Sequence, residues 1–218
     1  IKGGCGTGKS AIALNLAKEI GKASIVVPVK NLQKQYEKDY TEKKFLIKEN
    51  GERLKIKIIT GRQNFVCPFL KDNPIKKQDE NSTLDVFRRV IEAEDNTNNK
   101  KDCSCDNPFL PCKIDIKEKN MSIIKGYLNK NPKLKRIPQF KEVRRMSIAP
   151  VCPFWSPIFP SSINLNLEDA EVREYLGLNN IAYKFYRRKP GCGYYDQYLS
   201  YLDADVLIFN SLKYKIET

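Results

Sequence analysis

The sequence predicts an α/β fold in which a parallel sheet with crossover helices is interrupted by one long insertion. Helical and strand-like patterns alternate over residues 1–66, and this order returns over residues 193–218. Such alternation is typical of a parallel sheet. Between the two parts, residues 67–192 are rich in Pro, Asn, Asp and Lys and hold most of the cysteines. We therefore expect an incomplete sheet domain formed by both ends of the chain, with the insertion between them.

Each element is predicted from the spacing of its apolar residues. In the first helix they recur at helical spacing, and Gly21 stands where that helix would end. The insertion has to organise itself, because structureless loops beyond about 15 residues are uncommon in compact domains. The expected elements are helices at 9–20, 31–40, 84–93 and 168–176, a periodic segment at 194–202, and strands at 24–27, 55–60 and 206–209.

The composition excludes several classes of chemistry. The 218 residues include no histidine, which removes Ser-His-Asp and Cys-His catalysis and His-ligated zinc. Lys and Arg outnumber Asp and Glu by 39 to 26, a net charge of +13 that favours a polyanionic partner, nucleic acid first and an anionic membrane surface second. No apolar run approaches the ~20 residues of a membrane span, and no signal peptide is evident. These features predict a cytoplasmic, intracellular protein.

A phosphate-binding loop is the strongest motif. Glycines at this spacing let backbone N–H groups surround phosphates, and the following helix adds its positive end. Lys9 would reach the β- and γ-phosphates of ATP and Ser10 would bind Mg²⁺, which gives both a catalytic role. The alternative is a glycine-rich turn that binds nothing. The loop comprises Gly3, Gly4, Cys5, Gly6, Thr7, Gly8, Lys9 and Ser10.

With this loop, the predicted sheet is that of a P-loop NTPase of RecA-like type. A strand normally leads into such a loop, yet here the chain begins at Ile1, two residues before the motif. We therefore expect a partial sheet and a chain that is an internal fragment of a longer polypeptide.

Seven cysteines in a chain of intracellular character point to a metal before disulfides, since an odd number cannot pair completely. Thiolates without imidazole fit tetrahedral zinc or an iron–sulfur cluster. Spacing alone does not choose between them, although the lack of paired C-x-x-C motifs counts against zinc. The alternative, that the cysteines are small buried apolar residues, does not explain their position at both ends of the insertion.

Several motifs in order resemble XPD/DinG-type helicases, most of all the archaeal members. They are GGCGTGKS, VPVKNLQKQYEKDY, GRQNFVC, the central cysteines, and CGYYDQYLSYLDADVLIFNSLKY. The resemblance implies a superfamily-two DNA helicase that uses ATP to move 5′ to 3′ on single-stranded or forked DNA, in DNA repair or transcription-linked unwinding. It also implies a [4Fe–4S] cluster held by four cysteines. By position these are Cys67, Cys105, Cys112 and Cys192; Cys103 competes with Cys105, and Cys152 is a further candidate.

The chain departs from the family pattern in two ways. Its insertion is longer than the usual cluster domain, and it ends at Thr218 before any D-E-x-H box. Phosphoryl transfer depends on the metal-binding carboxylate of that box and on arginines of a second motor domain. We therefore expect this fragment to bind nucleotide weakly and not to unwind DNA, the activity belonging to the full-length parent.

Basic segments supply candidate nucleic-acid contacts. Lys and Arg outnumber Asp and Glu by eleven to three over residues 113–145, which would give salt-sensitive binding to phosphates. Over residues 183–189 aromatic and basic residues alternate, as in single-strand binders, so Tyr186, Arg187 and Arg188 are candidates. Arg62 and Asn64 follow the strand at 55–60, where a motor would meet DNA. The alternative is a solvated basic face with the tyrosines in the core.

Two other functions remain open from the sequence. One is a nucleotide-binding protein with a zinc-stapled insertion and no helicase activity. The other is a non-catalytic nucleic-acid-binding module whose phosphate loop is vestigial.

Overall fold

A strand that is buried along its whole length, β6 (Val206–Asn210), forms the centre of a parallel three-stranded sheet. The computed structural model describes residues 8–72 and 103–218. In the sheet, β6 pairs with β1 (Ala23–Val27) on one side and with β2 (Ile56–Ile59) on the other. The predicted parallel sheet and its three strands are therefore confirmed, and the P-loop assignment of that sheet stays a prediction.

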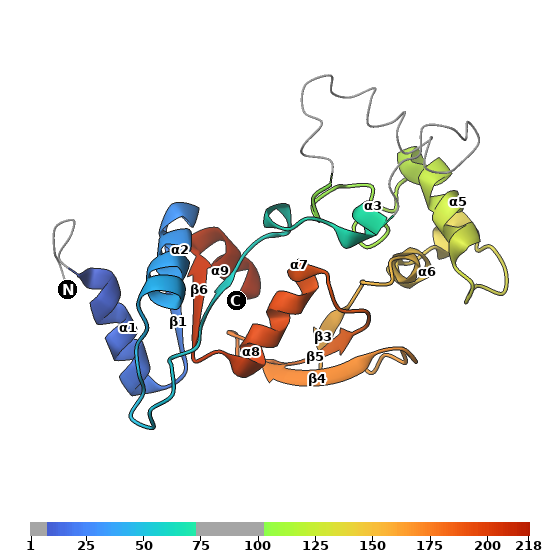
Figure 1. Cartoon of the computed structure of the whole chain (residues 1–218). Helices are drawn as coiled ribbons and strands as arrows, with labels where there is room; N and C mark the ends of the chain where they lie inside the picture. Colours follow the sequence, from blue (N-terminus) through green and yellow to red (C-terminus); the bar gives the residue numbers. More distant parts are fainter. Residues whose placement is uncertain (1–7, 73–102) are drawn as a thin grey trace, which may run out of the picture.

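The side chains of β6 alternate between two hydrophobic cores. Val206 and Ile208 pack with residues of α1 (Lys9–Ile20) and α2 (Lys30–Glu37), whereas Leu207 and Phe209 face a core that contains the cysteines. A strand buried on both faces is typical of a parallel sheet whose two sides are covered. Figure 1 shows α1, α2 and α9 (Ser211–Glu217) grouped around this sheet.

The insertion is organised around elements of its own. A third core joins α5 (Met121–Lys130) to α6 (Arg145–Ile148) through residues such as Ile124 and Ile148, both fully buried. In Figure 1 these helices lie at the opposite end of the molecule from α1. The described part of the insertion, residues 67–72 and 103–192, therefore has secondary structure and a core of its own. Shorter helical pieces also occur before, within and after the insertion. They are η1 (Lys38–Lys43), η2 (Arg62–Asn64), α3 (Pro68–Asp72), η3 (Glu118–Asn120), η4 (Phe140–Glu142), η5 (Ala149–Val151), α7 (Gly193–Asp196), η6 (Gln197–Leu199) and α8 (Ser200–Asp203).

A small antiparallel sheet lies inside the insertion, where the sequence predicted a helix at 168–176. Its order is β3 (Ile158–Pro160), β5 (Ala182–Arg187), β4 (Glu171–Leu176). The helix prediction was wrong because β4 pairs along its whole length with β5, and the Tyr175 ring stacks on Tyr183 with centroids 5.7 Å apart. Cross-strand pairing of this kind overrides a weak local pattern. The other predicted helix of the insertion, at 84–93, lies outside the described residues.

The insertion leaves the sheet after β2 and returns through α7, η6 and α8, which form the crossover to β6. Gln197 fixes this crossover to the end of β2, because its amide accepts from the Thr60 N–H (2.9 Å) and donates to the Thr60 carbonyl (3.1 Å). A helical crossover runs back along the sheet between parallel strands. The start of α7 therefore lies at the same edge of the sheet as the exit of β2. Within residues 8–72 and 103–218, no helix has the length and apolar composition needed to cross a membrane.

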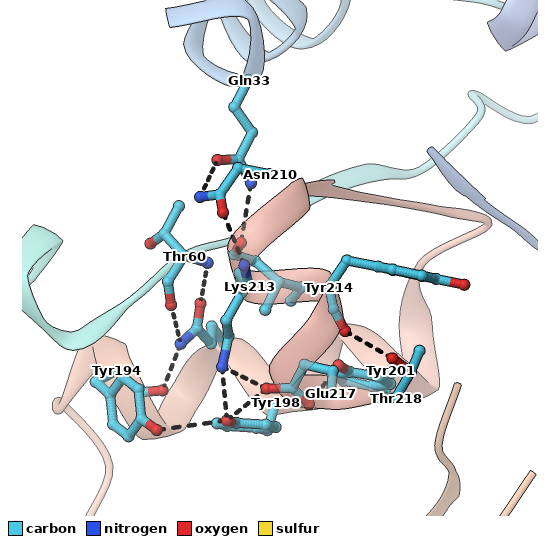
Figure 2. A network of polar contacts seen from close by, with 12 residues as sticks. Gln33, Thr60, Tyr194, Tyr198, Tyr201, Asn210, Lys213, Tyr214, Glu217 and Thr218 are labelled. Carbon is cyan, nitrogen blue, oxygen red and sulfur yellow. Dashed lines mark hydrogen bonds and ion pairs between the residues drawn. The ribbon is translucent and has the colours of Figure 1, made fainter. Parts of the chain in front are cut away.

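A buried polar network connects α2, β6 and α9 (Figure 2). Gln33 donates to the carbonyls of Ile59 (2.9 Å) and Ile208 (2.8 Å), and Asn210 caps α9 by accepting from the Lys213 N–H (2.8 Å). The Lys213 ammonium pairs with Glu217, and both side chains are less than one-seventh exposed, at 8% and 13%.

Two tyrosines complete the network around Glu217. The Tyr201 hydroxyl donates to one carboxylate oxygen at 2.9 Å, and the Tyr198 hydroxyl lies 3.1 Å from the other. Burial raises the pKa of both phenols well above the ordinary value, so both stay protonated and able to donate.

Glu217→Gln is expected to destabilise the protein by about 3–5 kcal/mol, because it leaves the Lys213 ammonium buried without its counter-charge. Glu168→Gln is the matched control: Glu168 pairs with Lys133 at 3.3 Å on an exposed surface, and its loss is expected to cost less than about 1 kcal/mol. Urea unfolding measures both. Equal effects of the two substitutions would contradict the assignment of Lys213 and Glu217 as a buried pair.

Candidate functional site

The phosphate-loop candidates are divided between described and undescribed residues. Gly8 has φ = +74°, a conformation that L side chains rarely adopt, and α1 begins directly after it at Lys9. The Ser10 side chain belongs to the first turn of the helix, where the positive end of the helix dipole favours anions. Gly3, Gly4, Cys5, Gly6 and Thr7 lie outside the described residues. The structure thus supplies the helix that the motif requires, and nucleotide binding stays a prediction.

The first group of thiols forms where the insertion begins. Residues 65–67 pair with residues 103–105: the Cys67 N–H donates to the Cys103 carbonyl (2.7 Å) and the Cys105 N–H to the Phe65 carbonyl (2.8 Å). The Cys105 thiol lowers the pKa of Cys67. The Cys105 and Cys192 sulfurs are 3.8 Å apart. Cys103 is exposed and contributes its backbone, so Cys105 is the member of this pair that joins the group.

Cys192 reaches the group because the residue after it is glycine. A Cβ on Gly193 would lie 2.7 Å from the Phe65 ring, closer than real Cβ atoms come. The absence of a side chain there lets the start of α7 approach the segment that carries Cys67. The two ends of the insertion therefore meet beside the sheet.

A second group consists of Cys112 and Cys152: the Cys152 thiol lowers the pKa of Cys112, and the Cys112 thiol raises the pKa of Cys152. Cys152 belongs to the core that contains Cys67, Cys105 and Cys192, and the half-buried Cys112 packs against this core. The Cys152 thiol and the Arg62 guanidinium, whose Nη1 lies 3.6 Å from the Cys112 sulfur, lower the pKa of Cys112 to about 6. The Cys105 thiol lowers the pKa of Cys192 to about 7. A lowered pKa favours the thiolate, the form that binds metals.

The thiols are close together without surrounding a single point. Among residues 8–72 and 103–218, no group of three or more Cys, Asp or Glu side chains has the geometry to hold a metal ion. The donor chemistry nevertheless fits a thiolate-ligated centre, because five buried or half-buried thiols come together and no imidazole is present. The four cysteines predicted from the sequence are all in this cluster, and Cys152 is the additional member.

Arg62, predicted to contact nucleic acid, points into the protein. Its guanidinium donates to the Tyr195 hydroxyl (3.0 Å) and lies over the Tyr194 ring, 4.1 Å from the centroid. Together with its contact to Cys112, these interactions connect the end of β2 to the cysteines and to α7. This inward role is not visible in the sequence, because all three partners are distant along the chain.

The predicted nucleic-acid contacts of the aromatic–basic run at 183–189 also make interactions within the protein. Tyr186 is 3% exposed; its hydroxyl accepts from the Leu165 N–H and donates to the Ile163 carbonyl. Arg187 pairs with Asp196 at 3.3 Å. Arg188 donates to the carbonyls of Cys152 (2.9 Å) and Pro150 (3.3 Å). In this structure Tyr186 and Arg187 belong to the central strand of the small sheet, and Arg188, directly after it, holds the sheet to the segment of Cys152. Their contact with nucleic acid stays a prediction.

A pocket of about 370 Å³ opens beside the carboxyl end of β2. Asn64 lines it, as do three exposed lysines that sequence reasoning missed: Lys30, Lys34 and Lys57. Lys30 and Lys34 are one helical turn apart on α2, which is the signal that could have found them. The remaining lining residues are Gln33, Glu37, Ile58, Thr60, Phe65, Gln197 and Ser200. The pocket thus combines cations, one carboxylate, amides, hydroxyls and one aromatic ring.

Comparisons with protein-family models, with curated proteins and with solved structures found no significant match.

Arg62→Gln is expected to raise the pKa of Cys112 by about 1 or more, because it removes the positive charge beside the thiolate. In metal-free protein, alkylation of Cys112 at pH 7 should then be slower, and its pH profile should move to higher pH. Peptide mapping after timed iodoacetamide treatment measures this. Arg53→Gln is the control, since Arg53 stacks on Phe45 instead; an unchanged profile in Arg62→Gln would show that Arg62 does not act on Cys112.

Proposed function

We propose that this chain is part of an ATP-dependent DNA helicase of XPD/DinG type, in which an iron–sulfur insertion is built into a nucleotide-binding sheet. The observation that carries the proposal is the meeting of thiols from both ends of the insertion beside the parallel sheet, Cys67 from one end and Cys192 from the other. The helicase activity is inferred from the resemblance of the sequence motifs to those of XPD/DinG-type helicases. ATP and Mg²⁺ would bind at the loop that ends in Lys9 and Ser10.

Cys67, Cys105 and Cys192, with a fourth thiol from Cys112, would hold the cluster. Such a centre would add covalent links between segments that hydrogen bonds already hold together, so its binding would add to the stability of the fold. Arg62 would donate a hydrogen bond to a ligand sulfur, as groups around metal ligands commonly do. A single strand of DNA would bind over the pocket at the end of β2, where lysines meet its phosphates and Phe65 offers a face for stacking.

A zinc-stapled insertion is the second candidate, and one distance favours it. A tetrahedral site with Zn–S distances of about 2.3 Å has sulfurs about 3.8 Å apart, and the Cys105 and Cys192 sulfurs are separated by 3.8 Å. The nucleotide loop is common to both candidates, so the metal distinguishes them.

Metal and sulfide analysis tests the first part of the proposal. Protein purified without oxygen is expected to contain iron and acid-labile sulfide at about four of each per chain, with the broad visible absorption of a [4Fe–4S] cluster. Cys103→Ser, at an exposed cysteine outside the cluster, is expected to leave this content unchanged. Zinc without sulfide would replace the iron–sulfur proposal with the zinc-stapled candidate.

Salt dependence of binding to single-stranded DNA tests the nucleic-acid surface. Replacing Lys30, Lys34 and Lys57 together by alanine is expected to weaken binding and to reduce the slope of log K against log[salt] by about 2, or ~0.7 per lost phosphate contact. The charge-matched control replaces Lys117, Lys119 and Lys125, exposed lysines of the basic segment 113–145. A larger effect of the control would place the DNA on the insertion and contradict the pocket.

A further inference from the structure

Two cysteines that are far apart along the chain lie next to each other in the structure. The sulfurs of Cys105 and Cys192 are 3.8 Å apart, although 87 positions separate the two residues. Both residues are buried, at 2% and 6% exposure, and they belong to the same hydrophobic core. In a disulfide the sulfurs are about 2.05 Å apart. The two atoms therefore need to approach each other by less than about 2 Å to form a covalent bond.

Backbone hydrogen bonds hold both cysteines in place. The Cys105 N–H donates to the Phe65 carbonyl (2.8 Å), and the Cys192 carbonyl accepts from the N–H of Asp196 in α7 (2.8 Å). Gly193 lets α7 approach Phe65 closely, because a Cβ at this position would lie 2.7 Å from the ring. The two thiols are thus kept adjacent by contacts that do not involve sulfur, which favours a reaction between them over a reaction with other molecules.

We propose that Cys105 and Cys192 are the site of an intramolecular disulfide, which hydrogen peroxide forms in the metal-free protein. Peroxide first oxidises one thiol to a sulfenic acid and releases water. The second sulfur then attacks the sulfenic sulfur, the S–S bond forms, and the hydroxyl group leaves as a second water with the proton of the second thiol. The two thiols lose two electrons in all, and these reduce the peroxide. A small oxidant suits the site because both sulfurs are buried.

The disulfide would join the end of the insertion to the segment that carries Cys105. The loop that it closes contains α5, α6 and the small antiparallel sheet, and closing so long a loop strongly restricts the unfolded chain. The bond also uses two of the thiols that the proposed metal centre needs, so bound metal and the disulfide exclude each other. The disulfide itself does not depend on the metal, and reduction by a thiol such as glutathione would restore both cysteines.

Peptide mapping of the whole metal-free chain tests the disulfide. The reduced protein is treated with hydrogen peroxide, the remaining thiols are alkylated with iodoacetamide, and the chain is digested with trypsin in the absence of reductant. We expect a linked peptide that contains Cys105 and Cys192 and that dithiothreitol separates. Trypsin leaves Cys103, Cys105 and Cys112 on one peptide, so fragmentation of the linked peptide identifies the cysteine that is bonded.

Serine substitutions give an independent assignment. Cys105→Ser and Cys192→Ser should each abolish the linked peptide, whereas Cys103→Ser, at the exposed cysteine of the same segment, should keep it. Urea unfolding is the second readout. Oxidation should raise the unfolding midpoint of the wild type and of Cys103→Ser, and should leave that of Cys105→Ser unchanged. Far-UV circular dichroism establishes that each variant is folded.

Two results in the wild type would overturn the disulfide, and they decide the question even where a variant fails to fold. One is that Cys105 and Cys192 stay free at a peroxide concentration that oxidises the exposed Cys103. The other is a bond from Cys192 to Cys103 or Cys112 in place of Cys105. All these measurements use metal-free protein, so a chain that takes up no metal would count against the proposed function alone.

Discussion

The burial of β6 on both faces is the constraint on which the rest of the structure depends. Its alternating side chains belong to two cores, so the chain has to return to the middle of the sheet after the long insertion. β2 and β6 are parallel neighbours, and a parallel connection needs a crossover that runs back along the sheet. The start of that crossover, α7, therefore lies at the edge where β2 ends. The proximity of Cys192 to Cys67 follows from the topology, before any metal is considered.

Several arginines of the chain are used inside the molecule. Arg62, Arg187 and Arg188 donate respectively to a tyrosine hydroxyl, a carboxylate and backbone carbonyls, and Arg145 to the carbonyls beside Cys112. A guanidinium suits this work because its several fixed donors can satisfy groups on different segments at once. Lysines, by contrast, provide the exposed cations of the pocket. The net charge of the chain thus has a structural and a surface component, which a residue count cannot separate.

The sequence predicts the parallel sheet well because its signals are local. The apolar spacing of α1 and the short apolar runs of β1, β2 and β6 each lie within one element, and the structure confirms all four. The strand β4 was mistaken for a helix, because its stability comes from pairing with β5 along the whole strand. The inward role of Arg62 was missed for the same reason, since its partners lie far away in sequence. For Tyr186, a core position was the alternative left open by the sequence, and its buried side chain agrees with that alternative. Similarly, the backbone pairing of residues 65–67 with residues 103–105 decides that Cys105, and not Cys103, joins the cluster. The spacing of the cysteines along the chain does not predict this pairing.

The cysteine cluster and the pocket lie on either side of the same residues, so a metal bound at the proposed centre would also affect the pocket. Phe65 lines the pocket, contacts the start of α7 through Gly193, and accepts a backbone hydrogen bond from Cys105. Thr60 and Gln197 line the same pocket and join β2 to the crossover. A metal that fixes Cys67, Cys105 and Cys192 would therefore also fix the wall of the pocket. Because a bound metal stabilises only the folded arrangement, metal loss would loosen the proposed DNA surface without altering any of its lysines, so metal content and DNA affinity should fall together.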